Sequence, residues 1–234
     1  MKLTCIIDAC SYIYLEESDF SVMIGGNNYS LLKLLDELVT IKYSPEVSRE
    51  ITRHLSSTSA NVLSRNNKIH SFSKLTETEY EQKLVAKVLP SPSPDKGEID
   101  NFAVAIDLFM MGKTALVFLT DDENALRGCL KELIPAFPIC EIWSSLDAVL
   151  FIYLKLYNSK KLKFTHNMAK NAIQDLLAYK FKQARKELEK LRSNFYPDEY
   201  AQKVQKLNNE VKDKQVKYFR HLYNIYNLLE VKRL

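Results

Sequence analysis

The segment Leu3-Thr4-Cys5-Ile6-Ile7-Asp8 decides the fold, because it is a short apolar run that ends in an acid. A run of this length beside a polar residue is typical of a buried strand in a parallel sheet. The pattern returns at Ala115–Leu119, which leads into Thr120-Asp121-Asp122. Further short strands are predicted at Val39–Lys42 and Ile139–Ile142, so four candidate strands are spread over the first 142 residues.

Helical segments alternate with these strands. Ser44 followed by Pro45 and Glu46 is a clear helix start, with a hydroxyl cap, proline at the first position and an acid in the first turn. Alternating strands and helices predict an α/β fold in which a parallel sheet carries helices on both faces. In such sheets, sites form at the carboxyl ends of the strands. The predicted helices are Ala9–Leu15, Leu31–Leu38, Ser44–His54, Glu77–Val88, Asp95–Met111, Asp122–Leu133 and Leu146–Leu156, with turns, loops or extended chain at 25–28, 56–73 and 89–94.

The C-terminal part has a different pattern and a different charge. Beyond Thr165 the apolar residues recur every three or four positions in two sets, separated by a turn at Asn194–Pro197, which predicts a hairpin of two long helices. Residues 159–234 hold 18 Lys and Arg against 8 Asp and Glu, a net charge of +10, whereas residues 1–158 carry −6. The chain is therefore predicted to comprise an α/β domain, 1–158, and a basic helical extension, 159–234.

Basic side chains beside aromatic ones in this extension fit single-stranded RNA, which is held by phosphate contacts and stacking. A merely solvated basic surface is the alternative. Homo-oligomerisation through the helical tail is an equal expectation and is compatible with RNA binding. The candidate nucleic-acid-binding residues are Lys180, Lys182, Arg185, Lys186, Lys214, Lys217 and Arg220.

Composition excludes several classes of protein. No apolar stretch reaches the length of about 18 residues that spans a bilayer, and Asp8 interrupts the N-terminus before a signal-peptide core develops. The four cysteines do not form a C-x-x-C pair, so a disulfide framework or a zinc site is not indicated. These features predict a cytoplasmic protein without a membrane partner.

The acids that the topology brings toward one edge of the sheet are the candidate site. Asp8 and the pair Asp121 and Asp122 follow predicted strands, the pair Glu98 and Asp100 opens a predicted helix, and Glu50 lies in the helix capped by Ser44. Carboxylates that share a cleft oppose joint ionisation unless they take up protons or bind cations. Hard oxygen ligands favour Mg²⁺ or Mn²⁺, and such ions activate water and polarise phosphoryl oxygens.

Four segments, in order, resemble the motifs of PIN-domain nucleases, a metal-dependent family that includes the toxin ribonucleases of bacterial toxin–antitoxin modules. Ile6-Ile7-Asp8-Ala9-Cys10-Ser11-Tyr12-Ile13 resembles the opening strand, and Ser44-Pro45-Glu46-Val47-Ser48-Arg49-Glu50-Ile51 resembles the segment with the family's glutamate. Gly97-Glu98-Ile99-Asp100-Asn101-Phe102-Ala103-Val104-Ala105 is similar to a G-E-x-E/D variant of the third motif. Phe118-Leu119-Thr120-Asp121-Asp122 is similar to the fourth.

The resemblance implies a PIN-like α/β/α sandwich and a ribonuclease that leaves a 5′-phosphate and a 3′-hydroxyl. It implies that Asp8, Asp100 and Asp122 bind Mg²⁺ or Mn²⁺ directly and that Glu50 acts through water or a second ion. Glu98 and Asp121 are candidates for further ligand or supporting roles. Thr120 and Ser11 are candidates for orienting the phosphate.

Two departures from the family pattern bear on activity. Cys10 stands where a small polar residue is usual, with Ser11 one place later, and the insertion 56–94 is long. The implied partners are RNA, single-stranded or structured as in tRNA, and a protein inhibitor or antitoxin in a toxin-like or defence role. A catalytically weak PIN scaffold that binds RNA or protein, and a DNA nuclease, are the alternatives.

Overall fold

The computed structural model of the 234-residue chain describes residues 3–24, 26–55, 68–72, 79, 96–113, 115–122 and 140–231, without the side chains of Lys96 and Glu98. Its central element is a four-stranded sheet in which every neighbouring pair is parallel. Across the sheet the strands are β4 (Thr40–Lys42), β1 (Thr4–Ile7), β5 (Leu116–Leu119) and β6 (Glu141–Trp143). The predicted α/β fold with a parallel sheet is therefore confirmed, and its assignment to the PIN-like type stays a prediction.

The register of the central strands fixes where the chain leaves the sheet. Ile7 is paired with Leu119, and every residue of β1 and β5 is buried, as their continuous apolar sequences predict. Parallel neighbours end at the same edge of a sheet. Asp8 and Thr120, the next residues of the two strands, therefore lie beside each other.

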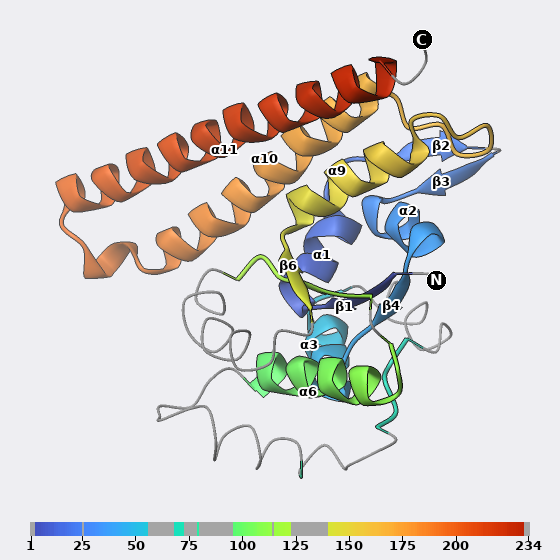
Figure 1. Cartoon of the computed structure of the whole chain (residues 1–234). Coiled ribbons are helices and arrows are strands. Elements are labelled where there is room, and N and C mark those ends of the chain that lie inside the picture. Colours follow the sequence, from blue (N-terminus) through green and yellow to red (C-terminus); the bar gives the residue numbers. More distant parts are fainter. Residues whose placement is uncertain are drawn as a thin grey trace. The chain divides into compact units, whose positions relative to one another are not determined.

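Helices α3 (Pro45–His54) and α6 (Lys96–Met110) pack on each other, and α6 also contacts β1 and β5 (Figure 1). The predicted start of α3 is confirmed, because the Ser44 hydroxyl accepts a hydrogen bond from the Val47 amide at 3.2 Å. In α6, Phe102 is fully buried and contributes to the core against the sheet.

Helices α1 (Ala9–Glu17) and α2 (Leu31–Leu38) are separated by an antiparallel hairpin that the sequence did not predict. Its strands are β2 (Val22–Ile24) and β3 (Asn27–Tyr29), and Gly26 turns the chain with a φ of +80°. The expected turn at 25–28 is thus the centre of a hairpin. Asn27 and Asn28 have low strand propensity, so the second strand gives little local signal.

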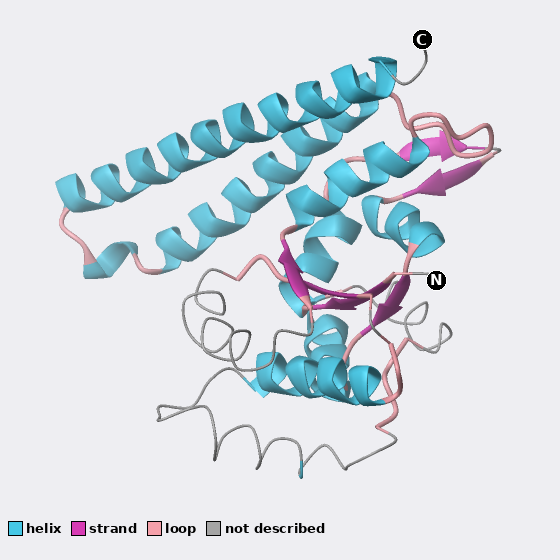
Figure 2. Cartoon of the chain, in the orientation of Figure 1, coloured by secondary structure: helices cyan, strands magenta, loops and turns pink. Residues whose placement is uncertain are grey.

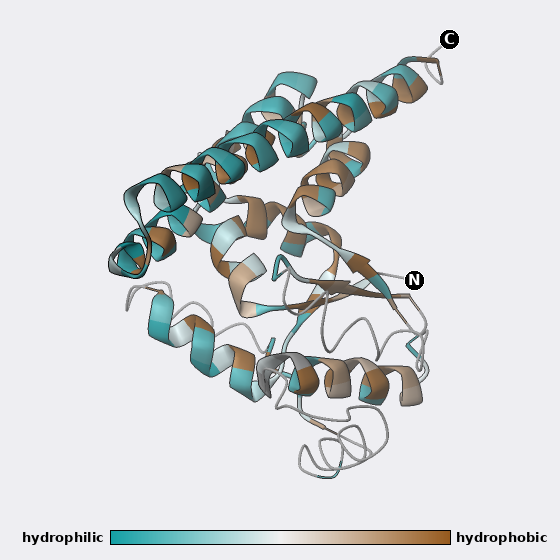
Figure 3. Ribbon diagram, turned by 90° about the vertical axis from the view of Figure 1, so that its left-hand side faces the viewer, coloured by the Kyte–Doolittle hydropathy of each residue, from teal (hydrophilic) through white to brown (hydrophobic). Residues whose placement is uncertain are grey.

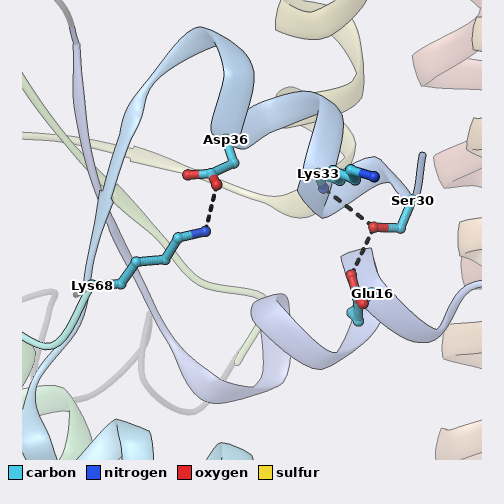
Figure 4. Close-up of polar contacts among 5 residues, drawn as sticks. All are labelled: Glu16, Ser30, Lys33, Asp36 and Lys68. Atoms are coloured by element: carbon cyan, nitrogen blue, oxygen red, sulfur yellow. Dashed lines mark hydrogen bonds and ion pairs between the residues drawn. The ribbon is translucent and has the colours of Figure 1, made fainter. Parts of the chain in front are cut away.

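The segment 68–72 adds to the edge of the sheet beyond β4. Tyr43 and Ile69 form a parallel bridge, and the His70 amide donates to the Tyr43 carbonyl at 2.9 Å. The His70 ring lies 2.8 Å from the buried Asp107 carboxylate of α6, and Lys68 pairs with Asp36 at 2.6 Å (Figure 4). Residues 68–72 of the predicted loop 56–73 therefore pair with the chain that follows β4, at the side of the sheet.

A different polar contact fixes the start of α2. The Ser30 hydroxyl accepts from the Lys33 amide and donates to Glu16 of α1 at 2.7 Å (Figure 4). Ser30 therefore caps the helix and links it to α1 through a side chain.

The C-terminal helices confirm the predicted hairpin of long helices. After α9 (Ser145–Leu156), α10 (His166–Lys190) and α11 (Pro197–Val231) pack on each other and are joined through η1 (Arg192–Asn194) (Figure 2). The buried positions of α11 are Tyr218 and Leu222. Along most of α11 the ribbon has the colour of hydrophilic residues (Figure 3).

By contacts, the chain divides into two compact units: Met1–Ile13 with Leu35–Ser145, and Tyr14–Leu34 with Leu146–Leu234. The boundaries of these units differ from the predicted division at residue 158. The division into an α/β domain, 1–158, and a helical extension, 159–234, stays a prediction. The predicted helices 77–88 and 122–133 and the extended chain 89–94 fall outside the described residues, apart from Glu79 and Asp122. No described helix has both the length and the apolar content needed to cross a bilayer.

Candidate functional site

The candidate site begins where β1 and β5 end. The Asp8 amide donates to the Leu119 carbonyl at 2.9 Å, which extends the pairing of the two strands by one residue and holds Asp8 beside the end of β5. Asp8 is only 7% exposed. A parallel sheet therefore places this carboxylate in a buried position at the edge where the sites of such sheets form.

Three donors hold the Asp8 carboxylate. The Ala9 amide, at the start of α1, donates to Oδ1 at 2.7 Å. The Cys10 thiol and the Thr120 hydroxyl both donate to Oδ2, at 2.8 and 3.1 Å. These contacts come from two separate parts of the chain, so the orientation of the carboxylate is fixed by the fold.

Burial raises the pKa of Asp8. The hydrogen bonds from Cys10, Ala9 and Thr120 work in the opposite direction, and the nearby charge of Asp122 adds to the increase. Burial and a second acid both disfavour the charged form of a carboxylate, so a bound cation would offset the charge at this position.

Thr120 connects the two acids. Its hydroxyl donates to Asp8 and accepts a hydrogen bond from the Asp122 amide at 3.2 Å, and its side chain is fully buried. In this structure Thr120 therefore fixes Asp8 against the chain that carries Asp122. Its predicted role in orienting a substrate phosphate stays a prediction.

Asp121 has a separate set of partners. Its carboxylate accepts from the Ser11 hydroxyl at 2.9 Å and from the Ser145 amide at 3.2 and 3.3 Å. Ser145 is the first residue of α9, and a carboxylate at a helix N-terminus is stabilised by its free amides. Asp121 therefore caps a helix here. Ser11, which is fully buried, donates to Asp121, and its predicted role in orienting a phosphate stays a prediction.

Cys10 occupies the position at which the sequence departs from the family pattern. Its thiol donates to Asp8, so it does part of the work that a hydroxyl would do there. Burial raises the pKa of Cys10 well above its usual range, and the charges of Asp8 and Asp121 act in the same direction. Cys10 is therefore a neutral hydrogen-bond donor in this environment.

Glu50 and Asp100 come from the two helices that pack together below the sheet. The Glu50 carboxylate lies over Gly97, where a methyl group built on Gly97 would stand 2.9 Å from Oε1. Asp100 follows Gly97 by three residues, so the two share a face of α6, and Asp100 is fully buried. The structure therefore gathers the predicted Glu50 and Asp100 around the first turn of α6.

Asn101 links this helix to the end of β1 and to the N-cap of α3, and the sequence patterns did not single it out. Its amide nitrogen donates to the Ile7 carbonyl at 2.9 Å, one residue before Asp8, and its amide oxygen accepts from the Ser44 amide at 2.8 Å. Asn101 is fully buried. A polar residue directly before the apolar run 102–106 was the available signal for this structural role.

A divalent cation needs several oxygen, nitrogen or sulfur donors close together. Among the described side chains, no group of three or more His, Cys, Asp or Glu is arranged to hold a metal ion. Mg²⁺, however, is commonly held by one or two carboxylates, water and substrate phosphates. Asp8 and Asp122 supply oxygen donors of the kind that this second arrangement uses, and the charge of Asp122 acts on Asp8. The side chain of Glu98, another predicted ligand, lies outside the described part.

The predicted nucleic-acid-binding residues are carried by α10 and α11. Lys180 is half-buried, with its ammonium group 5.4 Å from the centre of the Tyr14 ring. Lys217 lies 5.5 Å from the ring centre of Tyr218, which is buried and therefore belongs to the core. The exposed members of the set are Lys182, Arg185, Lys186, Lys214, Lys217 and Arg220.

Comparison of the chain with protein-family models, curated protein sequences and solved structures gives no significant match. The fold is a four-stranded parallel sheet flanked by helices and followed by a pair of long helices. Many α/β folds share that arrangement. The functional argument therefore rests on the residues at the sheet edge.

Proposed function

We propose that the protein is a Mg²⁺- or Mn²⁺-dependent endoribonuclease of the PIN-like type. The observation that carries the proposal is the buried Asp8 carboxylate, held at the end of β1 with Asp122 close enough to raise its pKa. The four motif-like segments support the same assignment, because the described acids of all four lie around the ends of β1 and β5 and the first turn of α6.

The residues divide the work between binding and support. Asp8 and Asp122 would hold the cation together with water and substrate phosphates. The predicted roles of Asp100 as a further ligand and of Glu50 through water or a second ion belong to the same proposal. When bound, the ion stabilises charge on the phosphoryl oxygen and makes water more acidic. Thr120 and Cys10 fix Asp8, while Ser11 and the Ser145 amide fix Asp121. This second set keeps the acids in place before substrate arrives.

The substrate in this proposal is RNA, either single-stranded or structured as in tRNA. The exposed basic side chains of α10 and α11 contact its phosphates without reading sequence. A toxin-like or defence role would add a protein inhibitor as partner and a cytoplasmic location.

The test is cleavage of single-stranded RNA and tRNA by the purified full chain with Mg²⁺ or Mn²⁺, with EDTA as a parallel reaction. Asp8→Asn and Asp122→Asn keep the size of the side chain and remove its charge. We expect each to lower the rate at least about 100-fold, the upper range for groups that tune a metal site. Asp198→Asn, at an exposed position of α11, is the matched control and should cleave as the wild type does.

The rival functions give different results in the same assay. RNA binding without cleavage, unchanged in both variants, would indicate a PIN-like scaffold and contradict the enzyme proposal. Cleavage of DNA in preference to RNA would indicate a DNA nuclease that uses the same acids. Running RNA and DNA side by side separates these outcomes.

A further inference from the structure

Gly97 lies in the first turn of α6, and the Glu50 carboxylate of α3 lies next to the space that a side chain at position 97 would occupy. A methyl group on Gly97 would lie 2.9 Å from Oε1, 3.2 Å from Oε2 and 3.3 Å from Cδ of Glu50. Ordinary contacts between a carbon and these atoms are longer. The Glu50 carboxylate of α3 therefore lies where a Cβ at position 97 would crowd it.

The backbone conformation does not explain this glycine. Among the described glycines, those with positive φ are Gly26, at +80°, and Gly112, at +82°. Gly97 lies in regular helix, where alanine is the better residue for helix stability. The reason for glycine at this position is thus the space that it leaves.

The space at Gly97 lets the Glu50 carboxylate approach the first turn of α6, the helix that also carries Asp100. The N-terminus of a helix carries free amides and a partial positive charge, which favour a carboxylate beside it. Asp100 follows one turn later on the same face, and Asn101 holds that turn to the Ile7 carbonyl next to Asp8. The position of the Glu50 carboxylate relative to the other acids is therefore set at Gly97.

We propose that Gly97 is a positioning residue, which admits the Glu50 carboxylate to the first turn of α6 and so sets its place among the acids of the site. The part of this inference that concerns catalysis rests on the proposed nuclease function. The geometric part does not, and it is tested separately.

The variant Gly97→Ala gives the test. The carboxylate is the end of a flexible side chain, so it moves away from the new methyl group while the helix keeps or gains stability. We expect the melting temperature to stay equal or rise, and RNA cleavage to fall at least about tenfold, because a displacement near 1 Å at a site costs up to about 100-fold in rate.

Gly112→Ala is the matched control at the other end of the same helix. Nothing lies within 4 Å of a methyl group there, but the φ of +82° is strained for alanine. This variant should lose thermal stability while the cleavage rate of the folded protein stays unchanged. The two substitutions, chemically identical, are therefore expected to affect stability and activity in opposite ways.

A readout independent of catalysis is the ¹³C resonance of the Glu50 carboxyl carbon, assigned with the Glu50→Gln variant. We expect Gly97→Ala to shift this resonance and Gly112→Ala to leave it as in the wild type. An unchanged resonance in Gly97→Ala would overturn the proposal, whether or not the protein cleaves RNA.

The shorter Glu50→Asp side chain completes a double-mutant cycle. If Gly97 acts through the Glu50 carboxylate, Gly97→Ala has a smaller effect on cleavage when Asp stands at position 50. If Gly97→Ala lowers the cleavage rate by the same factor with Glu and with Asp at position 50, the proposal is contradicted. A wild type that does not cleave refutes the nuclease function alone, and the resonance still decides the role of Gly97.

Discussion

The edge of the β1–β5 pair and the α10–α11 hairpin both carry many charged side chains, but they hold their charges differently. At the sheet edge, Asp8 accepts hydrogen bonds from residues 9, 10 and 120, and Asp121 from residues 11 and 145. On the hairpin, the ion pairs are exposed and local, as between Lys190 and Glu187 at 2.6 Å. Such pairs contribute only a few tenths of a kcal/mol.

The difference separates two uses of charge. Fixed, buried carboxylates have lost the solvent that would otherwise reorganise around a reacting group, which suits chemistry. Solvated lysines and arginines on a helix remain free to adapt to a flexible polyanion, which suits binding. The sheet edge should therefore be sensitive to single substitutions, and the hairpin should respond to the sum of its charges.

The largest expected effect is on the core beneath the site. Ile6 in β1 is fully buried, and Ile6→Ala should lower the free energy of unfolding by about 2 to 5 kcal/mol through lost packing and a cavity. Denaturant unfolding followed by the fluorescence of Trp143, the single tryptophan, reports on the sheet. Val216→Ala on α11, where the side chain is 59% exposed, should change stability by less than about 0.5 kcal/mol. Equal losses of stability in Ile6→Ala and Val216→Ala would contradict the expected difference between the sheet and the hairpin.

The next effect comes from the buried amide that joins the strand to the helices. Asn101→Ala leaves the Ile7 carbonyl and the Ser44 amide without this partner, which should cost about 2 to 3 kcal/mol. The same unfolding experiment measures it. Asn227→Ala, at an exposed position on α11, is the control. A near-neutral Asn101→Ala would mean that the amide does not hold these segments together.

A smaller effect is expected on RNA binding by the hairpin. Replacing the exposed residues Lys182, Arg185 and Lys186 with Gln removes three phosphate contacts in the proposed function. The slope of log affinity against log salt should fall by about 2, at roughly 0.7 for each contact with a single strand. Fluorescence anisotropy with labelled RNA over a range of salt measures this. An unchanged slope would place RNA binding elsewhere on the protein.

The smallest effect concerns pH. Burial lowers the pKa of His166, and the charge of Lys170 adds to this, while the ring faces Tyr153 and Tyr226. The unfolded chain then binds a proton more readily than the native protein does. Stability is therefore full above the usual pKa of about 6.5 and declines as the pH falls below it.

Unfolding followed by circular dichroism, which weights the long helices, should show this decline in the wild type and a smaller one in His166→Gln. The exposed His221→Gln serves as the control. If His166→Gln loses stability on acidification as strongly as the wild type, another group is responsible.

Local patterns were sufficient for much of the fold. The apolar runs before Asp8 and Thr120, the Ser44 cap and the helical spacing beyond Thr165 each depend on neighbouring residues, and the structure confirms the elements that they predicted. The parallel order of β1 and β5 followed from the alternation of strands and helices, which also brought the acids of the sheet edge together.

Contacts between distant residues could not be predicted in the same way. The buried pair of His70 and Asp107 joins residues 37 positions apart, and neither sits in a recognisable pattern. A supporting role for Asp121 was among the predictions, but its partner was not: the Asp121 carboxylate accepts a hydrogen bond from the Ser145 amide at the start of α9. Which of two adjacent acids faces a site depends on where a later helix begins, and that is a tertiary property.

The central claim is that Asp8 and its neighbours bind a divalent cation, and Mn²⁺ binding followed by electron paramagnetic resonance tests it most directly. Titration of the full chain should show Mn²⁺ bound to the wild type and competed away by Mg²⁺, with affinity at least about tenfold lower in Asp8→Asn and unchanged in Asp198→Asn. The melting temperature should rise with Mn²⁺ in the wild type and not in Asp8→Asn. Equal Mn²⁺ binding by the wild type and Asp8→Asn, or no binding by either, would contradict the account.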